Sequence, residues 1–290
     1  MRKTNIYEVA GHRFAVTAKS DLLQEMEQKY GPFLVNNQEV EKLVFWLKVV
    51  EAKEFPSTEG IDEEIIQDEN IVNILIGHVG EQSYFEFRHN NMCEGKMIVS
   101  SNYQEAVVTT PGDALYIVNT AAMLMYTLST AKMKTVLFHA SVVENSGRAY
   151  LFLGKSGTGK STHSQLWIKY ILGTKLVNDD NPVVRINNQG KAIVYGSPWS
   201  GKTPCYRNVS YPIGGFVKLR QAPENIITRL GDVEAYAAIV ASISGKRWDR
   251  AMADGLHETE NALVMNVPVW HMDCRPDREA AELCQSRIKN

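Results

Sequence analysis

Cysteine is scarce in this chain of 290 residues, and its spacing excludes two kinds of site. None of the four cysteines belongs to a C-x-x-C pair, and they lie far apart, at Cys93, Cys205, Cys274 and Cys284. This spacing argues against a zinc site and against the disulfide framework of a small secreted protein. We expect reduced thiols that are partly buried.

Long apolar runs and an excess of charge are also missing. The longest apolar stretch, residues 114–128, is interrupted by polar residues and is shorter than the ~20 residues that span a bilayer. The first residues carry charge but no apolar run of signal-peptide length. The 31 basic and 33 acidic residues give a formal charge of −2, whereas a general nucleic-acid binder usually carries a basic excess. These features favour a cytoplasmic protein that binds neither membranes nor nucleic acid.

What is present is the composition of an ordinary globular protein. Hydrophobic residues make up 44% of the chain and charged residues 22%, so a core can be buried. At roughly 150 residues per domain, the length suggests about two domains. We expect a β-rich N-terminal domain over residues 1–132 and an α/β domain with a mixed sheet over residues 133–290.

The first domain is predicted to be a sheet with few helices. Residues 6–17 alternate around Gly11 like a hairpin, and residues 20–30 have a helical pattern that Ser20 or Asp21 could cap. Turn-separated strands, whose spacing favours an antiparallel sheet, are predicted at Leu43–Val49, Ile71–Ile76, Tyr84–Arg88, Lys96–Ser100 and Ala106–Thr109.

Two further segments can be interpreted from their composition, one acidic and one rich in helix formers. The acidic run from Gly60 to Asn70 is predicted to be a solvated loop, since a run of carboxylates usually is one. Good helix formers over residues 114–131 predict a helix that connects the two domains.

The second domain is predicted to alternate strands and helices. Strands are expected at Thr135–Val143, Arg148–Leu153, Lys191–Tyr195 and Val267–Asp273, and helices at Ser161–Ile171, Asp232–Ser242 and Asp277–Ile288.

Residues 154–161 match the pattern G-x-x-x-x-G-K-[ST] of a phosphate-binding loop. This glycine loop consists of Gly154, Lys155, Ser156, Gly157, Thr158, Gly159, Lys160 and Ser161, and Thr162 follows it in the predicted helix. Glycines let the backbone curl so that several N–H groups converge on phosphate oxygens, and the start of a helix favours an anion. Lys160 would place a charge between the β- and γ-phosphates, and the Ser161 hydroxyl would bind Mg²⁺. Residues 154–162 are therefore predicted to bind ATP or another phosphate donor.

Two adjacent aspartates, Asp179 and Asp180, end the strand that follows the loop helix. A kinase needs one carboxylate to hold Mg²⁺, directly or through water, and another to accept the proton of the attacking hydroxyl. Neighbouring residues of a regular strand point to opposite faces, so both aspartates could serve one site only if the strand breaks there. The following Asn181-Pro182 favours such a break.

Two more features lie near the glycine loop in sequence. His139 stands on a predicted strand, where a histidine is more often a core residue than a catalyst, but its closeness to the loop makes it a candidate. The segment Gly196 to Lys202 follows another strand. It could bind an anion or a ribose, with Trp199 covering the ligand, or it could be a plain hairpin connection.

The stretch from Thr135 to Gln221 resembles the catalytic domain of HPr kinase/phosphorylase and the phosphate-loop core of ATP-dependent phosphoenolpyruvate carboxykinase. The matching pieces are His139, the glycine loop, and the pair Asp179-Asp180. The resemblance implies a PEP carboxykinase/HPr kinase-like phosphate-loop domain in which Lys160 and His139 are catalytic. By position it implies that Asp179 is the base and that Asp180, with Ser161, holds the metal.

The first hypothesis is an ATP- and Mg²⁺-dependent kinase that phosphorylates a hydroxyl. HPr kinase carries a further signature of the Glu-Ile-Arg-Gly type that is absent here, so the acceptor stays open between a serine side chain, a peptide and a small molecule. The alternatives are a non-catalytic nucleotide sensor and a small carboxykinase-like enzyme. A GTPase is disfavoured because no N-K-x-D motif follows the loop. Sheet edges in the first domain would allow homo-oligomer contacts.

Overall fold

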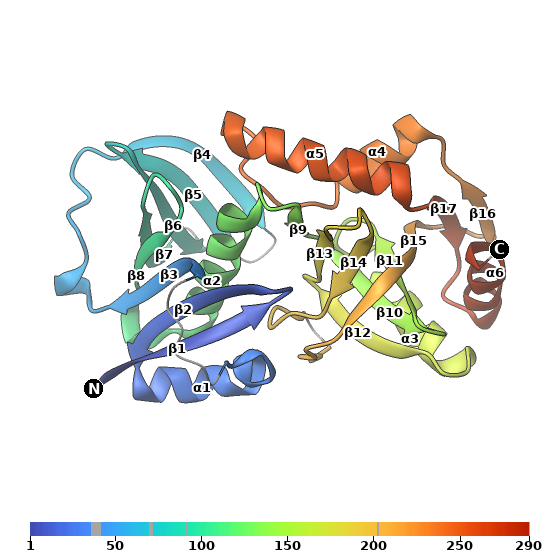
Figure 1. Ribbon diagram of the computed structural model, residues 1–290, viewed down its shortest axis with the longest axis horizontal. Coiled ribbons are helices and arrows are strands. Elements are labelled where there is room, and N and C mark those ends of the chain that lie inside the picture. Colours follow the sequence, from blue (N-terminus) through green and yellow to red (C-terminus); the bar gives the residue numbers. More distant parts are fainter. Residues whose placement is uncertain (36–41, 70–71, 91, 202, 290) are drawn as a thin grey trace. The chain divides into compact units, whose positions relative to one another are not determined.

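The computed structural model describes residues 1–35, 42–69, 72–90, 92–201 and 203–289 (Figure 1). The chain divides into two compact units, Met1–Ser129 and Thr130–Asn290. Each unit combines helices with a sheet that contains both parallel and antiparallel neighbours, so the chain has the expected α/β class.

The first unit is built on an eight-stranded sheet with the order β1-β2-β3-β8-β7-β6-β5-β4. Its strands are β1 (Arg2–Val9), β2 (His12–Lys19), β3 (Leu43–Val50), β4 (Asp62–Glu69), β5 (Val72–Val79), β6 (Gln82–His89), β7 (Met92–Val99) and β8 (Glu105–Thr109), and its helices are α1 (Ser20–Tyr30) and α2 (Leu115–Thr130). The predicted hairpin, both helices and the five predicted strands are all found, with small shifts of their ends.

Aromatic side chains hold both helices to one face of this sheet. The rings of Phe14 on β2 and Phe45 on β3 stack with centroids 4.8 Å apart, and Tyr126 on α2 meets Phe14 edge-on. The Tyr126 hydroxyl donates to the Val9 carbonyl at 2.9 Å. On α1, Tyr30 packs against Tyr7 of β1.

Three predictions for the first unit are wrong. The sheet is not purely antiparallel, because α1 carries the chain from β2 across to β3, and β3 lies parallel to both β2 and β8. The acidic run contains strand β4, which lies at the edge of the sheet, where charged residues are tolerated. Asn70 and Ile71 lie outside the described residues. Helix α1 is preceded by Lys19 without a side-chain cap, and the Ser20 hydroxyl donates to the Met1 carbonyl instead.

The second unit is built on a sheet with the order β12-β10-β11-β15-β14-β13-β9, in which β17 also pairs with β15, and β16 with β17. Its strands are β9 (Thr135–Leu137), β10 (Ala140–Asn145), β11 (Arg148–Leu153), β12 (Lys175–Asp180), β13 (Val183–Ile186), β14 (Ala192–Tyr195), β15 (Ser210–Gln221), β16 (Ile226–Arg229) and β17 (Val269–Cys274), and its helices are α3 (Lys160–Tyr170), α4 (Asp232–Val240), α5 (Arg250–Asn266) and α6 (Arg278–Ile288).

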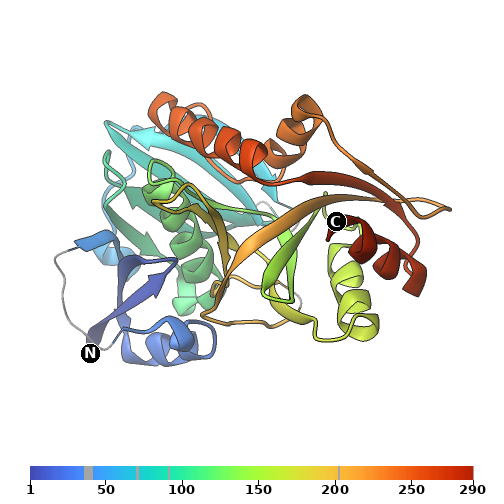
Figure 2. The same ribbon diagram turned by 45° about the vertical axis from the view of Figure 1, so that its right-hand side comes forward.

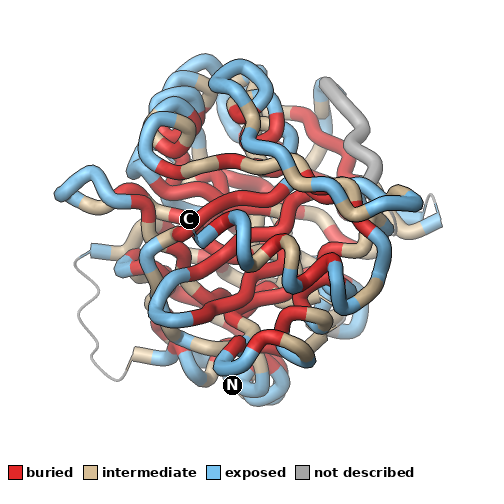
Figure 3. Tube along the Cα trace, turned by 90° about the vertical axis from the view of Figure 1, so that its right-hand side faces the viewer, coloured by how far each residue is buried: buried red, intermediate tan, exposed pale blue. Residues whose placement is uncertain are grey.

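Helices α3 and α6 lie side by side and cover one face of this sheet (Figure 2). Trp167 of α3 is fully buried among Tyr150 and Phe152 of β11 and the small residues of α6, which include Ala280 and Cys284. In Figure 3 the strands form the buried interior, and exposed residues gather on helices and turns. This packing fixes the start of α3 at the end of β11.

Helix α5 is the main element that the sequence analysis did not predict. Its pattern is visible in retrospect, because the Asp249 side chain accepts from the Met252 amide as an N-cap. Met252, Leu256 and Leu263 are buried at helical spacing.

The four cysteines are free, and all but Cys93 are buried, as the sequence predicted. Within the described ranges, no helix is both long and apolar enough to cross a membrane.

Candidate active site

The glycine loop lies between the end of β11 and the start of α3, in the strand–loop–helix arrangement that the sequence predicts. Gly154, Gly157 and Gly159 have φ values of 146°, 82° and 96°, which side chains other than glycine rarely adopt. A Cβ atom on Gly154 would lie 2.5 Å from the Thr158 hydroxyl oxygen, because the loop curls back on itself. The Thr158 hydroxyl closes this curl by donating to the Lys155 carbonyl at 2.8 Å.

Most of the loop is open to solvent. Lys155, Ser156, Gly157, Ser161 and Thr162 are exposed, whereas Lys160 is buried. Several residues predicted to meet phosphate or Mg²⁺ are therefore accessible, and Lys160 is the buried member of the loop.

One side chain that the sequence analysis missed contacts the tip of the loop. Gln221, the last residue of β15, donates from Nε2 to the Gly157 carbonyl at 3.0 Å. Strand β15 runs parallel to β11 and extends beyond it, which brings Gln221 beside the loop. Local sequence patterns carry no signal for this contact, because it joins residues 64 positions apart and depends on the pairing of two strands.

His139 does not stand on a continuous strand, which corrects the prediction of one strand over Thr135–Val143. Strand β9 ends at Leu137, and β10 begins at Ala140 next to a different part of the sheet. The strand breaks because the backbone amide of residue 139 bonds away from the β13 segment that pairs with β9 and still accepts from residue 138. Phe138 donates to the Pro182 carbonyl at 3.1 Å, and His139 donates to the Ser242 carbonyl at 2.7 Å.

This break places His139 between two of the predicted site residues. Nζ of Lys160 lies 2.9 Å from Nε2 of His139, and Nδ1 of His139 lies 3.2 Å from Oδ1 of Asp180. The Lys160 ammonium also donates to the carbonyls of Gly154 and Lys155, at 2.8 and 3.2 Å. His139, Lys160 and Asp180 thus form one connected group at the base of the glycine loop.

The electrostatics of this group depend on Lys160. Burial lowers the pKa of Lys160, and the negative charges of Asp180 and Asp179 only partly offset this lowering. A phosphate group in the loop would add negative charge and favour the ammonium form.

The two aspartates differ in their surroundings. Asp180 pairs in register with Ala140, is partly exposed, and accepts from Nδ2 of Asn181 at 2.9 Å. Asp179 pairs with Ser141, whose hydroxyl lies 2.6 Å from the Ser164 hydroxyl of α3. Asp179 is 4% exposed, and neither of its carboxylate oxygens has a hydrogen-bond partner among the described residues.

The expected strand break between the aspartates is not found. Both belong to β12, which ends at Asp180. They can nevertheless act on one cation, because Lys160 lies at the strand end, where the charges of both carboxylates reach it.

The loop after β14 supports the aspartates. The hydroxyl of Ser197 donates to the Asn181 carbonyl at 2.6 Å and accepts from Nδ2 of Asn178 at 3.1 Å. Gly201 donates its amide to the Asp179 carbonyl at 2.8 Å. Trp199 is buried, so it packs inside the unit and does not cover a ligand. Lys202 lies outside the described residues.

The carboxylates suit a Mg²⁺ ion that arrives with a phosphate ligand. In the part of the chain that the structure describes, no three His, Cys, Asp or Glu side chains gather into a metal site. Mg²⁺ in phosphoryl-transfer sites needs only one or two carboxylates, because phosphates and water supply the other ligands. The partly exposed Asp180 carboxylate and the exposed Ser161 hydroxyl are donors of the type that Mg²⁺ prefers.

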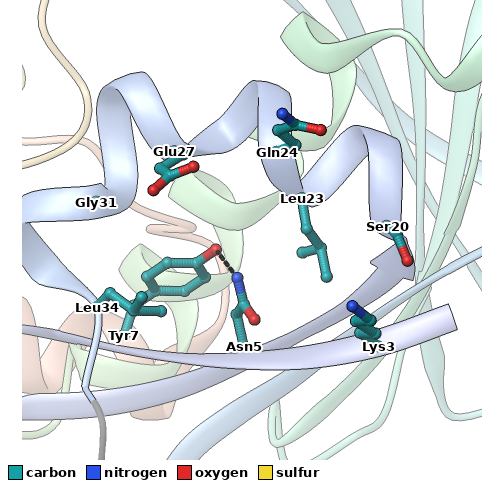
Figure 4. A pocket seen from close by; sticks show the side chains of 9 residues that line it. All are labelled: Lys3, Asn5, Tyr7, Ser20, Leu23, Gln24, Glu27, Gly31 and Leu34. Atoms are coloured by element: carbon teal, nitrogen blue, oxygen red, sulfur yellow. Dashed lines mark hydrogen bonds between the residues drawn. The ribbon is translucent and has the colours of Figure 1, made fainter.

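A cavity in the first unit contains none of the predicted site residues (Figure 4). It lies between β1 and α1 and has a volume of 230 Å³. Tyr7 and Leu23 line it together with polar side chains, and the Tyr7 hydroxyl accepts from Nδ2 of Asn5 at 3.1 Å. The predicted chemistry is confined to the second unit.

No family model and no curated protein matches the chain. Among solved structures, it is similar to the Hpr(Ser) kinase/phosphatase from Coxiella burnetii, with 15% sequence identity and a TM-score of 0.32. The match covers 53% of this chain and 88% of that one. At this identity and TM-score we draw neither a reaction nor a substrate from the likeness.

Proposed function

We propose that the chain is an ATP- and Mg²⁺-dependent phosphotransferase that moves a phosphoryl group to a hydroxyl. The acceptor would be a serine side chain, a peptide or a small molecule. Phosphoryl transfer requires little covalent chemistry from the protein, so positioning and charge neutralisation supply most of the catalysis.

The glycine loop and Lys160 would bind the phosphates. The glycine-rich backbone of the loop and the start of α3 favour an anion. Lys160 is held by two loop carbonyls and His139, so its charge is already at the base of the loop. An ammonium fixed in advance loses little freedom when phosphate binds.

The observation that carries the proposal is the buried, unpartnered carboxylate of Asp179. An unsatisfied buried charged group costs more than the about 1–3 kcal/mol of a neutral one, so a partner supplied by a ligand is expected. The oxygens of Asp180 already contact His139 and Asn181, whereas those of Asp179 are buried and have no hydrogen-bond partner among the described residues. We therefore assign Asp179 as the base, and Asp180 with the Ser161 hydroxyl as the Mg²⁺ ligands. When bound, Mg²⁺ would neutralise charge on the phosphates.

The test is the pair of variants Asp179→Asn and Asp180→Asn. Both keep the side-chain size and remove the carboxylate charge. Asp179→Asn should reduce transfer at least ~100-fold, the usual contribution of a general base, while calorimetry still detects MgATP binding. Asp180→Asn should instead raise the Mg²⁺ concentration needed for half-maximal activity. The measurement is single-turnover transfer from labelled ATP to a panel of free serine, serine peptides and hydroxyl-bearing metabolites.

Two outcomes would redirect the assignment. Full transfer activity in Asp179→Asn would remove Asp179 as the base. Tight MgATP binding by the unaltered protein without transfer to any acceptor, and without ATP hydrolysis, would favour a nucleotide sensor over an enzyme.

A further inference from the structure

The backbone around His139 is held by the connection between α4 and α5. The His139 amide donates to the Ser242 carbonyl at 2.7 Å, and the Ser244 amide donates to the Leu137 carbonyl at 3.3 Å. Between these bonds, Phe138 and Ile243 form an isolated antiparallel bridge. The break that places His139 in the site is thus paired, residue by residue, with residues 242–244.

A single guanidinium group fixes residues 242–244 in turn. Nη2 of Arg247 donates to the carbonyl of Val240, at the end of α4, at 3.1 Å, and to the carbonyl of Ile243 at 3.4 Å. The same nitrogen lies 2.7 Å from Oε1 of Glu260 on α5. Arg247 therefore joins the end of α4 and Ile243 to a fixed point on the next helix.

The Glu260 carboxylate that anchors Arg247 is buried, and both of its oxygens are hydrogen-bonded. Glu260 is 1% exposed, and its second oxygen, Oε2, accepts from the Tyr236 hydroxyl at 3.1 Å. The ion pair is only partly buried, because the Arg247 side chain is 36% exposed, and such a pair adds little to stability. The directional hydrogen bonds of Arg247 do fix the positions of the Val240 and Ile243 carbonyls relative to Glu260.

We infer that Arg247 and Glu260 are positioning residues that set the location of His139 between Lys160 and Asp180. The link runs from Glu260 through Arg247 to Ile243 and its neighbours, and from there to the His139 backbone. Neither residue touches the glycine loop or the aspartates through any described hydrogen bond or ion pair. The kinetic part of the inference rests on the proposed function, whereas the structural part does not.

The structural test compares two isosteric changes on the same helix. Glu260→Gln removes the charge that holds Arg247, whereas Glu258→Gln removes an exposed carboxylate whose partner is Lys134, at 3.1 Å. Amide hydrogen exchange of the whole protein, followed by NMR, should show exchange of the His139 amide roughly tenfold faster in Glu260→Gln. Exchange at Leu151 in β11 should stay unchanged, and Glu258→Gln should leave both amides unaffected.

The kinetic test uses the same variants in the transfer assay. Glu260→Gln should lower kcat roughly tenfold with little change in the KM for MgATP, because the glycine loop itself is untouched. Arg247→Met should have the same effect, and the double variant should be no worse than either single one, since both changes break one link.

Unchanged exchange at His139 in a folded Glu260→Gln protein would overturn the inference, and so would fully additive losses in the double variant. Absence of transfer in the unaltered protein would instead count against the proposed function. The exchange comparison would still decide the role of Arg247 and Glu260 in that case.

Discussion

The ammonium of Lys160 and the ring of His139 meet at 2.9 Å, between Nζ and Nε2. Because an ammonium has only donors, Nε2 must accept, and the ring proton therefore lies on Nδ1. Nδ1 faces Oδ1 of Asp180 at 3.2 Å. A neutral His139 ring can thus bind Asp180 through one nitrogen and Lys160 through the other, and so fix the two side chains relative to each other. A protonated ring would repel the ammonium.

Replacing His139 with Phe should separate catalysis from binding. The ring keeps its approximate shape but loses both polar contacts, so Lys160 and Asp180 are no longer linked. Transfer should fall roughly 100-fold, while the affinity for MgATP should fall less, because the loop amides remain. Single-turnover transfer and calorimetry measure the two effects. Equal losses in both would show that His139 acts on nucleotide binding alone.

Lys160→Met should weaken nucleotide binding directly. A hydrogen bond to a charged group contributes about 1.5–3 kcal/mol, so the affinity for MgATP should fall roughly 10- to 100-fold. Lys169→Met is a matched control, because Lys169 lies at the far end of the same helix and is exposed. Calorimetry that gave the same dissociation constant for both variants and the unaltered protein would contradict phosphate binding by the glycine loop.

The candidate residues of this site could be recognised from local sequence patterns. Gly154 to Ser161 follow a fixed spacing between a strand and a helix, and both elements were recognisable from their residue types. The Asp179-Asp180 pair was recognisable because it ends an apolar strand. In each case the signal lay within a few residues of the sequence.

The supporting contacts could not be predicted, because they join residues that are far apart in the chain. The His139 amide reaches Ser242, and Gln221 reaches Gly157. Strand alternation therefore misplaced His139, since nothing in residues 135–143 signals that the backbone turns there to other partners. The parallel pairing of β3 was missed for the same reason.

His163 should make the protein sensitive to acid. Its ring on α3 is buried, accepts from Nε1 of Trp167 at 3.2 Å, and is therefore neutral. Burial lowers the pKa of His163 from 6.5 to about 4. Between pH 6.5 and about pH 4 the unfolded chain therefore binds more protons than the folded protein. The free energy of unfolding is then constant above pH 6.5 and falls as the pH drops toward 4.

The size of this loss can be measured by urea unfolding. The shift corresponds to about 3 kcal/mol at most, of which about 2 kcal/mol should be lost between roughly pH 7 and pH 5. His163→Gln cannot titrate there, so its unfolding free energy should decline less over the same interval. Parallel declines in the two proteins would show that His163 is not the group responsible.

Gly201→Ala should disturb the aspartates without replacing any charged side chain. A Cβ atom on Gly201 would lie 2.8 Å from the Asp179 carbonyl oxygen and 3.0 Å from Cβ of Asp180. Because these atoms belong to a paired strand, they cannot move away cheaply, and overpacking of this kind costs about 1–3 kcal/mol. The strain should displace both carboxylates from Lys160, so transfer should fall at least ~10-fold, more than the loss of stability explains.

Gly31→Ala is the control, since its Cβ would have an ordinary contact at 3.5 Å with Glu27. Thermal unfolding and single-turnover transfer, measured on both variants, decide the matter: normal transfer in a destabilised Gly201→Ala protein would mean that the close approach of this loop serves folding and not the position of the acid pair.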